Sequence, residues 1–350
     1  MKPAGNYENP NLDRAVVKLY SKNGHSALVK SSDLEGRTQI SAEQNGSTLQ
    51  IKGQAGSQSN HDALVVEVPV VHGVYVEAEK EANVEVSDFI ESEFCTISSD
   101  MGTVNANRIK TDAMTVGTNS GDIVCTGHMQ GTIKLNSVSG NVISEQRFIG
   151  PSLDISTDTG DIRIASSYSE QVCIIILFVE ENNCHRLTFQ SKFVTNRGKI
   201  NLRNIHNESY IACYENGDVK IKGIDGSTNI FVKKGDLEIH VSQIKHESRI
   251  LVEEGDVILK MIDTHPVKLS IDANQIILDT KFSKYGKLEQ RQDQSSTCMH
   301  YSASIHPNVF SPALTVIAEN GNVIVESQDW AASLGLKLAN PKYTGDELKL

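Results

Sequence analysis

A glycine that recurs about every nineteen residues is the feature of this sequence that most restricts its fold. It stands in short segments such as DMGTV, NSGDIV, DTGDIRI and EEGDVIL, and between the first of these and the last successive glycines lie 18 to 20 residues apart, except for one step of 38. Self-similarity at a short fixed period is typical of proteins built by stacking similar coils. The predicted turn glycines are Gly102, Gly121, Gly140, Gly160, Gly198, Gly217, Gly235, Gly255 and Gly321.

The residues around each turn glycine alternate between apolar and polar. The second residue after the glycine is always apolar, the fourth is mostly apolar, and another apolar residue stands five positions before it. This period of two is typical of short strands with one buried face. The columns predicted to face inward are Val104, Ile123, Val142, Ile162, Ile200, Val219, Leu237, Val257, Ile276 and Val323 after the turn, and Ile97, Val116, Leu135, Ile155, Phe193, Ala212, Ile230, Ile250, Leu269 and Val316 before it.

A unit of nineteen residues cannot bury its own apolar face, so neighbouring units must stack. The sequence therefore predicts an all-β fold, a β-solenoid of roughly 19-residue coils in which each coil runs through a strand, a Gly-Asp turn, a second strand and a corner. Counting on from Gly255 gives Asn274, and we interpret this asparagine as a left-handed substitute for glycine. An antiparallel sandwich is the alternative, but it does not require one apolar column in the same phase across all repeats.

The repeat also predicts the boundaries of the chain's parts. Residues 1–60 fit it poorly but contain strand-like segments such as RAVVKLYS, and we expect them to cap one end of the stack. Residues 61–330 form the predicted solenoid. Within it, residues 281–312 lengthen the step between Asn274 and Gly321 beyond one repeat, and they are polar in their first half. This indicates a surface loop insertion. Residues 331–350 show no repeat and are interpreted as a tail.

Residues 172–190, VCIIILFVEENNCHRLTFQ, fill the 38-residue step and allow two interpretations. They form either an atypical coil, with Val172 and Ile176 at inward positions, or an insertion of one repeat length between two regular coils. Glu181 and Asn183 stand where other coils have mostly apolar residues, which favours the insertion. The apolar run is too short for a membrane span, which needs about 20 residues.

An acidic or amide residue follows most turn glycines, and it is the one column with chemical content. Stacked carboxylates repel each other unless they are neutralised. Bound Ca²⁺ could neutralise Asp218, Asp236 and Asp256, the weak candidate metal ligands. Alternatively, each Asp accepts hydrogen bonds from backbone N–H groups of its own turn. The residues before the turn glycines predict a stack of acid, base and acid in three successive coils, namely Glu215, then Lys233 and Lys234, then Glu253 and Glu254. Because these side chains already supply counter-charges, they favour the second alternative and no cofactor.

No catalytic motif accompanies the repeat. The sequence contains no G-x-S-x-G, no H-E-x-x-H, no P-loop and no isolated dinucleotide fingerprint. We therefore expect a non-enzymatic scaffold that offers its flat faces or its edge loops to a protein partner whose identity is unknown. The alternative function is a hydrolase or lyase that acts on glycans through the Asp column, or a binding module stabilised by Ca²⁺.

Charge and the amino-terminal segment narrow the partners and the compartment. The formal net charge is −11, from 44 acidic and 33 basic side chains, and it repels nucleic acid and anionic membranes. We expect neither a nucleic-acid partner nor a membrane span. The first residues, MKPAGNYENPNLDRAVV, have neither the apolar segment of a secretory signal nor the Arg-rich character of a transit peptide. An intracellular location is therefore expected.

The runs SGDI, TGDIRI, NGDVKI and EGDVIL at these steps resemble the adhesin-type repeat domains found across bacteria and in some animal proteins. Within that family, NRGKINLRNIHNESYIACYENGDVKIKGIDG looks like an animal member. The resemblance covers about residues 64–327. It implies a repetitive all-β fold without assigned catalytic residues.

Overall fold

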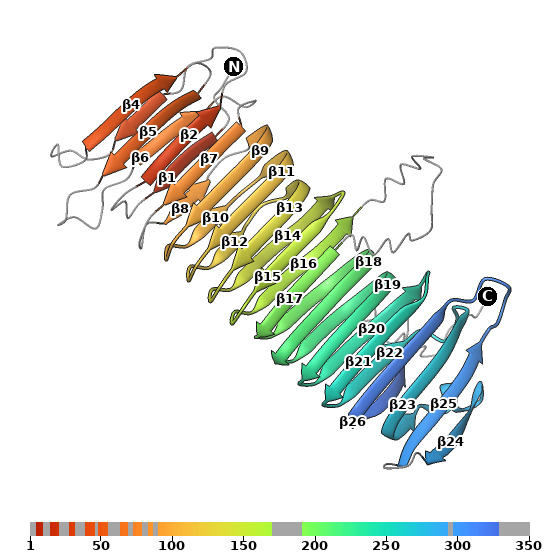
Figure 1. Cartoon of the computed structure of the whole chain (residues 1–350). Coiled ribbons are helices and arrows are strands. Elements are labelled where there is room, and N and C mark those ends of the chain that lie inside the picture. The colour runs from red at the N-terminus through yellow and green to blue at the C-terminus, as the bar shows by residue number, and fades with distance from the viewer. Residues whose placement is uncertain are drawn as a thin grey trace, which may run out of the picture.

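The protein is a long β-solenoid with antiparallel strands at both ends (Figure 1). The computed structural model describes residues 73–78, 83–86, 90–169, 191–292 and 297–328, and also the backbone of strands at 5–9, 15–20, 28–31, 39–45, 48–54 and 64–68. In these ranges the one helix is the single turn α1 (Thr280–Ser283), and no helix is long and apolar enough to cross a membrane. The predicted fold class is confirmed.

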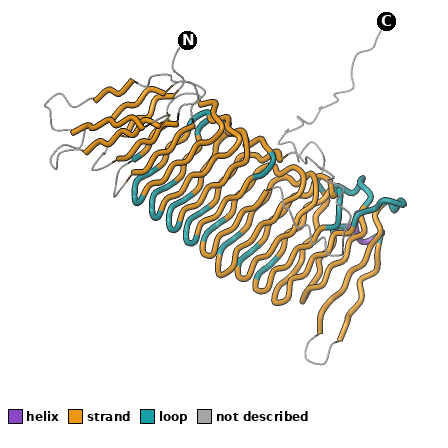
Figure 2. Tube along the Cα trace, turned by 45° about the horizontal axis from the view of Figure 1, so that its top comes forward, coloured by secondary structure: helices purple, strands orange, loops and turns teal. Residues whose placement is uncertain are grey.

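Parallel strands form two rows, one before and one after each turn glycine. The first row contains β7 (Gly73–Ala78), β9 (Ile90–Ser99), β11 (Ile109–Thr118), β13 (Met129–Ser137), β15 (Leu153–Thr157), β17 (Ser191–Arg197) and β21 (Ser248–Glu254). The second row contains β8 (Val84–Val86), β10 (Val104–Ala106), β12 (Ile123–Cys125), β14 (Val142–Gly150), β16 (Ile162–Ser169), β20 (Leu237–Ile244) and β22 (Val257–Met261). The long strands β18 (Ile200–Asn216) and β19 (Val219–Lys234) run through both rows. Figure 2 shows the turns stacked along the edge of the rod.

The apolar columns lie in register between coils and form the core. Ile97 pairs with Val116, Val116 with Leu135, and Leu135 with Ile155, and all four side chains are buried. The column after the turn is buried at all ten predicted positions. Because each residue meets its counterpart in the next coil, the alternation read from the sequence gives the inward face correctly.

Two members of the column before the turn, Ala212 and Leu269, are buried as expected but were assigned to the wrong position along their strands. Ile211, not Ala212, pairs with Ile230, because β18 carries an extra residue near the turn. Ile271, not Leu269, pairs with Val316, since the last coil passes its turn in fewer residues than its neighbour. Both errors come from counting a fixed distance back from the turn residue.

The order of the last coils in space differs from their order in the sequence. β26 (Ala313–Ser327) pairs in parallel with β21 and β22 on one side and with β23 (Val267–Leu278) on the other. The coil of Gly321 therefore lies between the coils of Gly255 and Asn274. The sequence pattern assigned Asn274 to the coil next to Gly255, and this assignment is wrong, because both segments fit the same repeat.

Residues 281–312 were predicted to be a surface loop insertion, and most of them form structure instead. β25 (Thr297–Ile305) pairs antiparallel with β23, and β24 (Gly286–Gln292) pairs antiparallel with β25. Phe282 of α1 and Tyr301 of β25 are fully buried, and the Tyr301 hydroxyl donates a hydrogen bond of 2.6 Å to the Phe282 carbonyl. The polar residues that suggested a loop belong to strands that end the stack and expose their outer face.

The other end of the stack has the same design. β2 (Ala15–Tyr20) pairs antiparallel with β7, and β1 (Gly5–Asn9) pairs antiparallel with β8. β5 (Thr48–Gln54) and β4 (Gln39–Asn45) continue from β2, while β6 (Leu64–Val68) and β3 (Leu28–Ser31) continue from β1. The segment expected to cap one end thus extends both rows with antiparallel strands.

Residues 172–190 lie outside the described residues, but the strands on either side of them pair directly. Ile155 of β15 faces Phe193 of β17, and Ile162 of β16 faces Ile200 of β18. The coils of Gly160 and Gly198 are therefore immediate neighbours. No coil lies between them, and this arrangement is the one that the insertion alternative predicts.

Candidate functional site

The column of Asp and Asn residues after the turn glycines forms a hydrogen-bond ladder between coils. The Oδ1 atom of Asp122 accepts the backbone N–H of Asn141 at 2.7 Å, and Asn141 Oδ1 accepts the N–H of Asp161 at 2.9 Å. The next residue in each coil donates to a backbone carbonyl instead, for example Ile123 N to Asn141 O at 2.8 Å. Each side chain thus supplies the acceptor that the backbone lacks at the corner.

The three candidate metal ligands stand in this ladder. Asp218 Oδ1 accepts the N–H of Asp236 at 3.3 Å, Asp236 Oδ1 accepts that of Asp256 at 3.0 Å, and Asp256 Oδ1 accepts that of Asn322 at 2.8 Å. The capping prediction gave the chemistry correctly but the partner wrongly, because the N–H belongs to the next coil. Among the described residues, no group of three or more His, Cys, Asp and Glu side chains is arranged to hold a metal ion.

Lys199 replaces the acidic residue in one coil and supplies a counter-charge. Its ammonium donates to Asp218 Oδ2 at 2.9 Å, and this bond lowers the pKa of Asp218 and raises the pKa of Lys199. The predicted stack of acid, base and acid is present in part. Lys234 pairs with Glu254 at 3.1 Å, whereas Glu215 pairs with Arg197 of the preceding coil at 2.8 Å.

We expect Asp256→Ala to lower the free energy of unfolding by about 1–2 kcal/mol, because Asp256 Oδ1 accepts two hydrogen bonds from Asn322. Asp256→Asn keeps the acceptor and should change the free energy little. Asn141 already fills the same position in another coil. Thermal unfolding of both variants tests this.

The same measurement on the wild-type chain, with Ca²⁺ and with a chelator, separates a cation site from a hydrogen-bond ladder. A bound cation would raise the melting temperature, and a ladder of hydrogen bonds to the backbone would not.

The turn glycines are required by the close approach of coils. A Cβ added to Gly140 would lie 2.1 Å from the carbonyl oxygen of Gly121, and one added to Gly160 would lie 2.0 Å from that of Gly140. Neither residue has a positive φ, although Gly235 and Gly255 do. The expected reason, a left-handed turn, therefore holds for only part of the column, and the interpretation of Asn274 as a left-handed residue is wrong, because its φ is not positive. In the coils from Gly121 to Gly255, and in that of Gly321, the absence of a side chain lets successive turns touch.

A buried hydroxyl column accompanies these turns and was not predicted from the sequence. Thr118 Oγ1 donates to the carbonyl of Gly121 at 2.5 Å, and Ser137 Oγ accepts the N–H of Gly140 at 2.8 Å. These side chains satisfy turn groups that are removed from water. The sequence signal is a Ser or Thr three positions before the glycine, found at Ser99, Thr118, Ser137, Thr157 and Thr195 and replaced by valine or alanine in the last coils.

A charged cluster lies on the second row at Glu238. This carboxylate accepts hydrogen bonds from Lys220, from Lys260 at 2.9 Å and from His240 at 3.2 Å. The bond from Lys220 is the main reason that the pKa of Glu238 is lowered to about 2. Burial lowers the pKa of His240.

The lowered pKa of Glu238 predicts a pH dependence of stability. Because the folded-state pKa lies below the unfolded value of about 4.3, the ionised form stabilises the fold above that pH, and this contribution is lost as the pH falls towards about 2. Glu238→Gln should therefore lose less stability than the wild-type chain between pH 7 and pH 3 in urea unfolding. Glu319→Gln, at an exposed site, is the control and should behave like the wild type.

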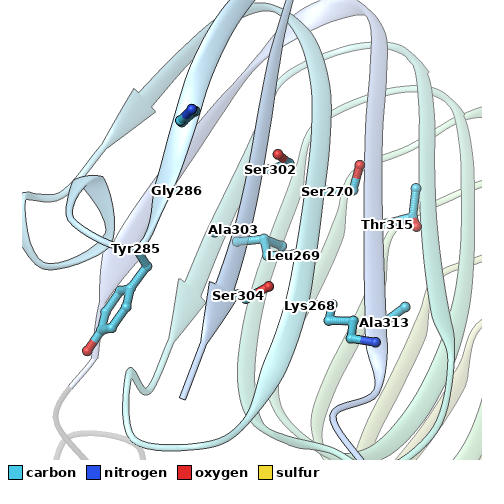
Figure 3. A pocket seen from close by; sticks show the side chains of 11 residues that line it. Lys268, Leu269, Ser270, Tyr285, Gly286, Ser302, Ala303, Ser304, Ala313 and Thr315 are labelled. Carbon is cyan, nitrogen blue, oxygen red and sulfur yellow. The ribbon is translucent and has the colours of Figure 1, made fainter. Parts of the chain in front are cut away.

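An open groove crosses the outer face of the sheet at the C-terminal end. It has a volume of about 460 Å³ and lies across β26, β23, β25 and β24. Figure 3 shows Ser302, Ser270 and Thr315 side by side on its floor, with Tyr285 at the edge. Lys268 and Lys287 also line the groove, and none of its described lining residues is a carboxylate. Although the whole chain is acidic, this groove is basic and rich in hydroxyl groups.

Two strongly exposed apolar side chains stand beside this groove. Val309 and Phe310 are 91% and 89% exposed, in the turn that joins β25 to β26. The turn is held by Asn308 and Ser311, with Phe310 N donating to Asn308 Oδ1 at 2.9 Å and Asn308 N donating to Ser311 Oγ at 2.8 Å. It is anchored to the groove by Lys268 N, which donates to the Pro312 carbonyl at 2.8 Å.

The family of the chain follows from comparison with known proteins. The model of the Toastrack DUF4097 family matches residues 16–172 and 185–326, most of the chain. The break in the match falls inside residues 172–190, between two coils that pair directly. No solved structure matches the chain. The chain is a member of the Toastrack DUF4097 family.

Proposed function

We propose that the protein is a non-enzymatic scaffold that binds a partner protein at its C-terminal end. The observation that carries the proposal is the pair of exposed apolar side chains, Val309 and Phe310, on a turn closed by its own hydrogen bonds. Exposed aromatic residues on a pre-organised turn are typical anchors of protein interfaces, since little conformational entropy is lost when they are buried.

The groove beside this turn supports the same proposal. Lys268 and Lys287 line it, Lys284 lies 4.7 Å from the ring of Tyr285, and none of the three forms an ion pair with a described residue. Lysines that lack a described ion-pair partner, around a floor of small hydroxyl side chains, complement an acidic segment of a partner. We therefore infer a partner with an apolar pocket for Phe310 and carboxylates that face the lysines.

The Asp column supports a structural role better than a catalytic one. The Oδ1 atoms of Asp218, Asp236 and Asp256 each accept a backbone N–H from the next coil. A carboxylate committed to the backbone is a poor general acid or nucleophile, because those roles need the oxygen to face a substrate. The absence of enzymatic activity and the intracellular location are parts of the proposal.

The test compares proteins captured from native extract, after crosslinking, by the full chain and by two double variants. Val309→Ser with Phe310→Ser removes the proposed anchor. Met101→Ser with Val138→Ser removes apolar side chains that are each 46% exposed at the glycine turns, and serves as the control. A partner retained by the control and lost by the first variant supports the proposal. Equal capture by all three chains would contradict it.

A further inference from the structure

The outer edge of β24 is a strand edge without a described partner. β24 pairs with β25 along its whole length and with no other strand in the part of the chain that the structure describes. It is the outermost strand at the C-terminal end of the rod (Figure 1). No described strand pairs with the N–H and C=O groups that point away from β25, and edges of this kind pair readily with a further chain.

The outer face of β24 carries charges of alternating sign. Lys287, Glu289 and Arg291 lie opposite residues of β25 and are exposed. Arg291 lies 4.0 Å from Asp272, whereas Lys287 and Glu289 form no ion pair with a described residue. A lysine on an edge strand ordinarily opposes association. Here a glutamate stands two residues away, so the sequence of the edge complements itself in an antiparallel arrangement.

The other face of β24 carries an exposed leucine. Leu288 lies opposite Tyr301, which is fully buried, so it faces the side of the core. It is nevertheless 46% exposed, because β24 lies two strands beyond the last coil. An apolar side chain in this position gains burial if a further strand is added to the sheet.

We propose that two copies of the chain associate through β24, antiparallel and related by a two-fold axis at Leu288. In this register the two Leu288 side chains face each other, and Lys287 of each copy faces Glu289 of the other. A register centred on Glu289 would set two glutamates opposite each other, and like charges in that position are destabilising. The contact uses the same surface on both copies, so it closes as a dimer.

The test is a charge exchange measured by sedimentation equilibrium of the full chain. The wild-type chain is expected to reach twice its mass of 38.3 kDa with rising concentration. Glu289→Lys alone and Lys287→Glu alone should each weaken the dimer at least tenfold, because each sets like charges opposite each other. An equimolar mixture of the two variants should restore the dimer, since every opposed pair is then complementary.

Controls separate this interface from a general effect of charge and from other occupants of the edge. Glu145→Lys and Lys134→Glu make the same changes at exposed positions in the solenoid and should leave the dimer unchanged. Leu288→Cys, in a Cys298→Ser background, should form an oxidised dimer, and Gln290→Cys should not. Each of three results would overturn the proposal. The wild-type chain could stay monomeric, the dimer could be insensitive to Glu289→Lys, or a dimer could appear only after deletion of residues 329–350.

The inference does not rest on the proposed function. Its readout is the mass of the purified protein, and Glu289→Lys leaves Val309, Phe310 and both lysines of the groove in place, whereas Lys287→Glu changes one lysine of the groove. A chain that dimerises but captures no partner would contradict only the proposed function, and a monomer that captures one would contradict only the dimer.

Discussion

Replacing Gly140 with alanine is expected to lower the free energy of unfolding by roughly 2–4 kcal/mol. The new Cβ would lie 2.1 Å from the carbonyl oxygen of Gly121. Ser137 holds both residues in place, because its hydroxyl donates to the Gly121 carbonyl at 3.1 Å and accepts the N–H of Gly140 at 2.8 Å, so the two turns cannot separate without breaking these bonds. Urea unfolding of the variant measures the effect.

Gly117→Ala is the matched control for this prediction. Gly117 lies in the same part of the rod, and a Cβ added there meets no atom within 4 Å. The substitution should be neutral or slightly stabilising, because alanine has less conformational freedom than glycine in the unfolded chain. If both variants were equally stable, the close approach of the turns would not be the reason for the glycine column.

Replacing Phe193 with alanine should cost about 3–5 kcal/mol, the usual range for a buried phenylalanine. Phe193 is fully buried between Ile155 and Ile211 of the neighbouring coils. The strand of Phe193 is hydrogen-bonded to a strand of the neighbouring coil on each side, so these strands cannot move into the cavity. We therefore expect a loss in the upper part of this range. Thermal and urea unfolding should agree on the loss.

Two further variants test whether the cost comes from the cavity. Phe193→Leu fills part of the space and should cost less than the alanine variant. Val309→Ala, at a site that is 91% exposed, should change the free energy of unfolding by less than about 0.5 kcal/mol. A small effect of Phe193→Ala would mean that the coils on either side of it can move together.

The repeat predicts most of the fold because each of its signals is local. The alternation around Gly121 or Gly160 depends only on which side of a strand a residue faces, and a stack of coils buries the same side throughout. The order of the last coils could not be predicted in this way. Asn274 and Gly321 fit the same pattern equally well, and nothing in either segment specifies its neighbour.

The candidate sites were predicted less completely. The Asp column was found from the sequence, but the acceptor role of Asp122 towards Asn141 depends on the distance between coils. The groove was missed, because Ser270 and Ser302 become neighbours only when β25 turns back against β23. Val309 and Phe310 lay within a segment interpreted as a surface loop, and their sequence alone does not show that their turn is closed by hydrogen bonds.

The insertion of β26 between β22 and β23 affects the order in which the chain can assemble during synthesis. A simple solenoid can add each coil to the preceding one as it leaves the ribosome, since every coil contacts only its predecessor in sequence. Here β23 is synthesised before the strand that must lie next to it. The C-terminal end of the rod therefore cannot close until residue 327 is available, and a nascent chain that stops near residue 312 leaves β22 and β23 without the neighbour they share. Completion of the last coils is a late, long-range step in an otherwise sequential process.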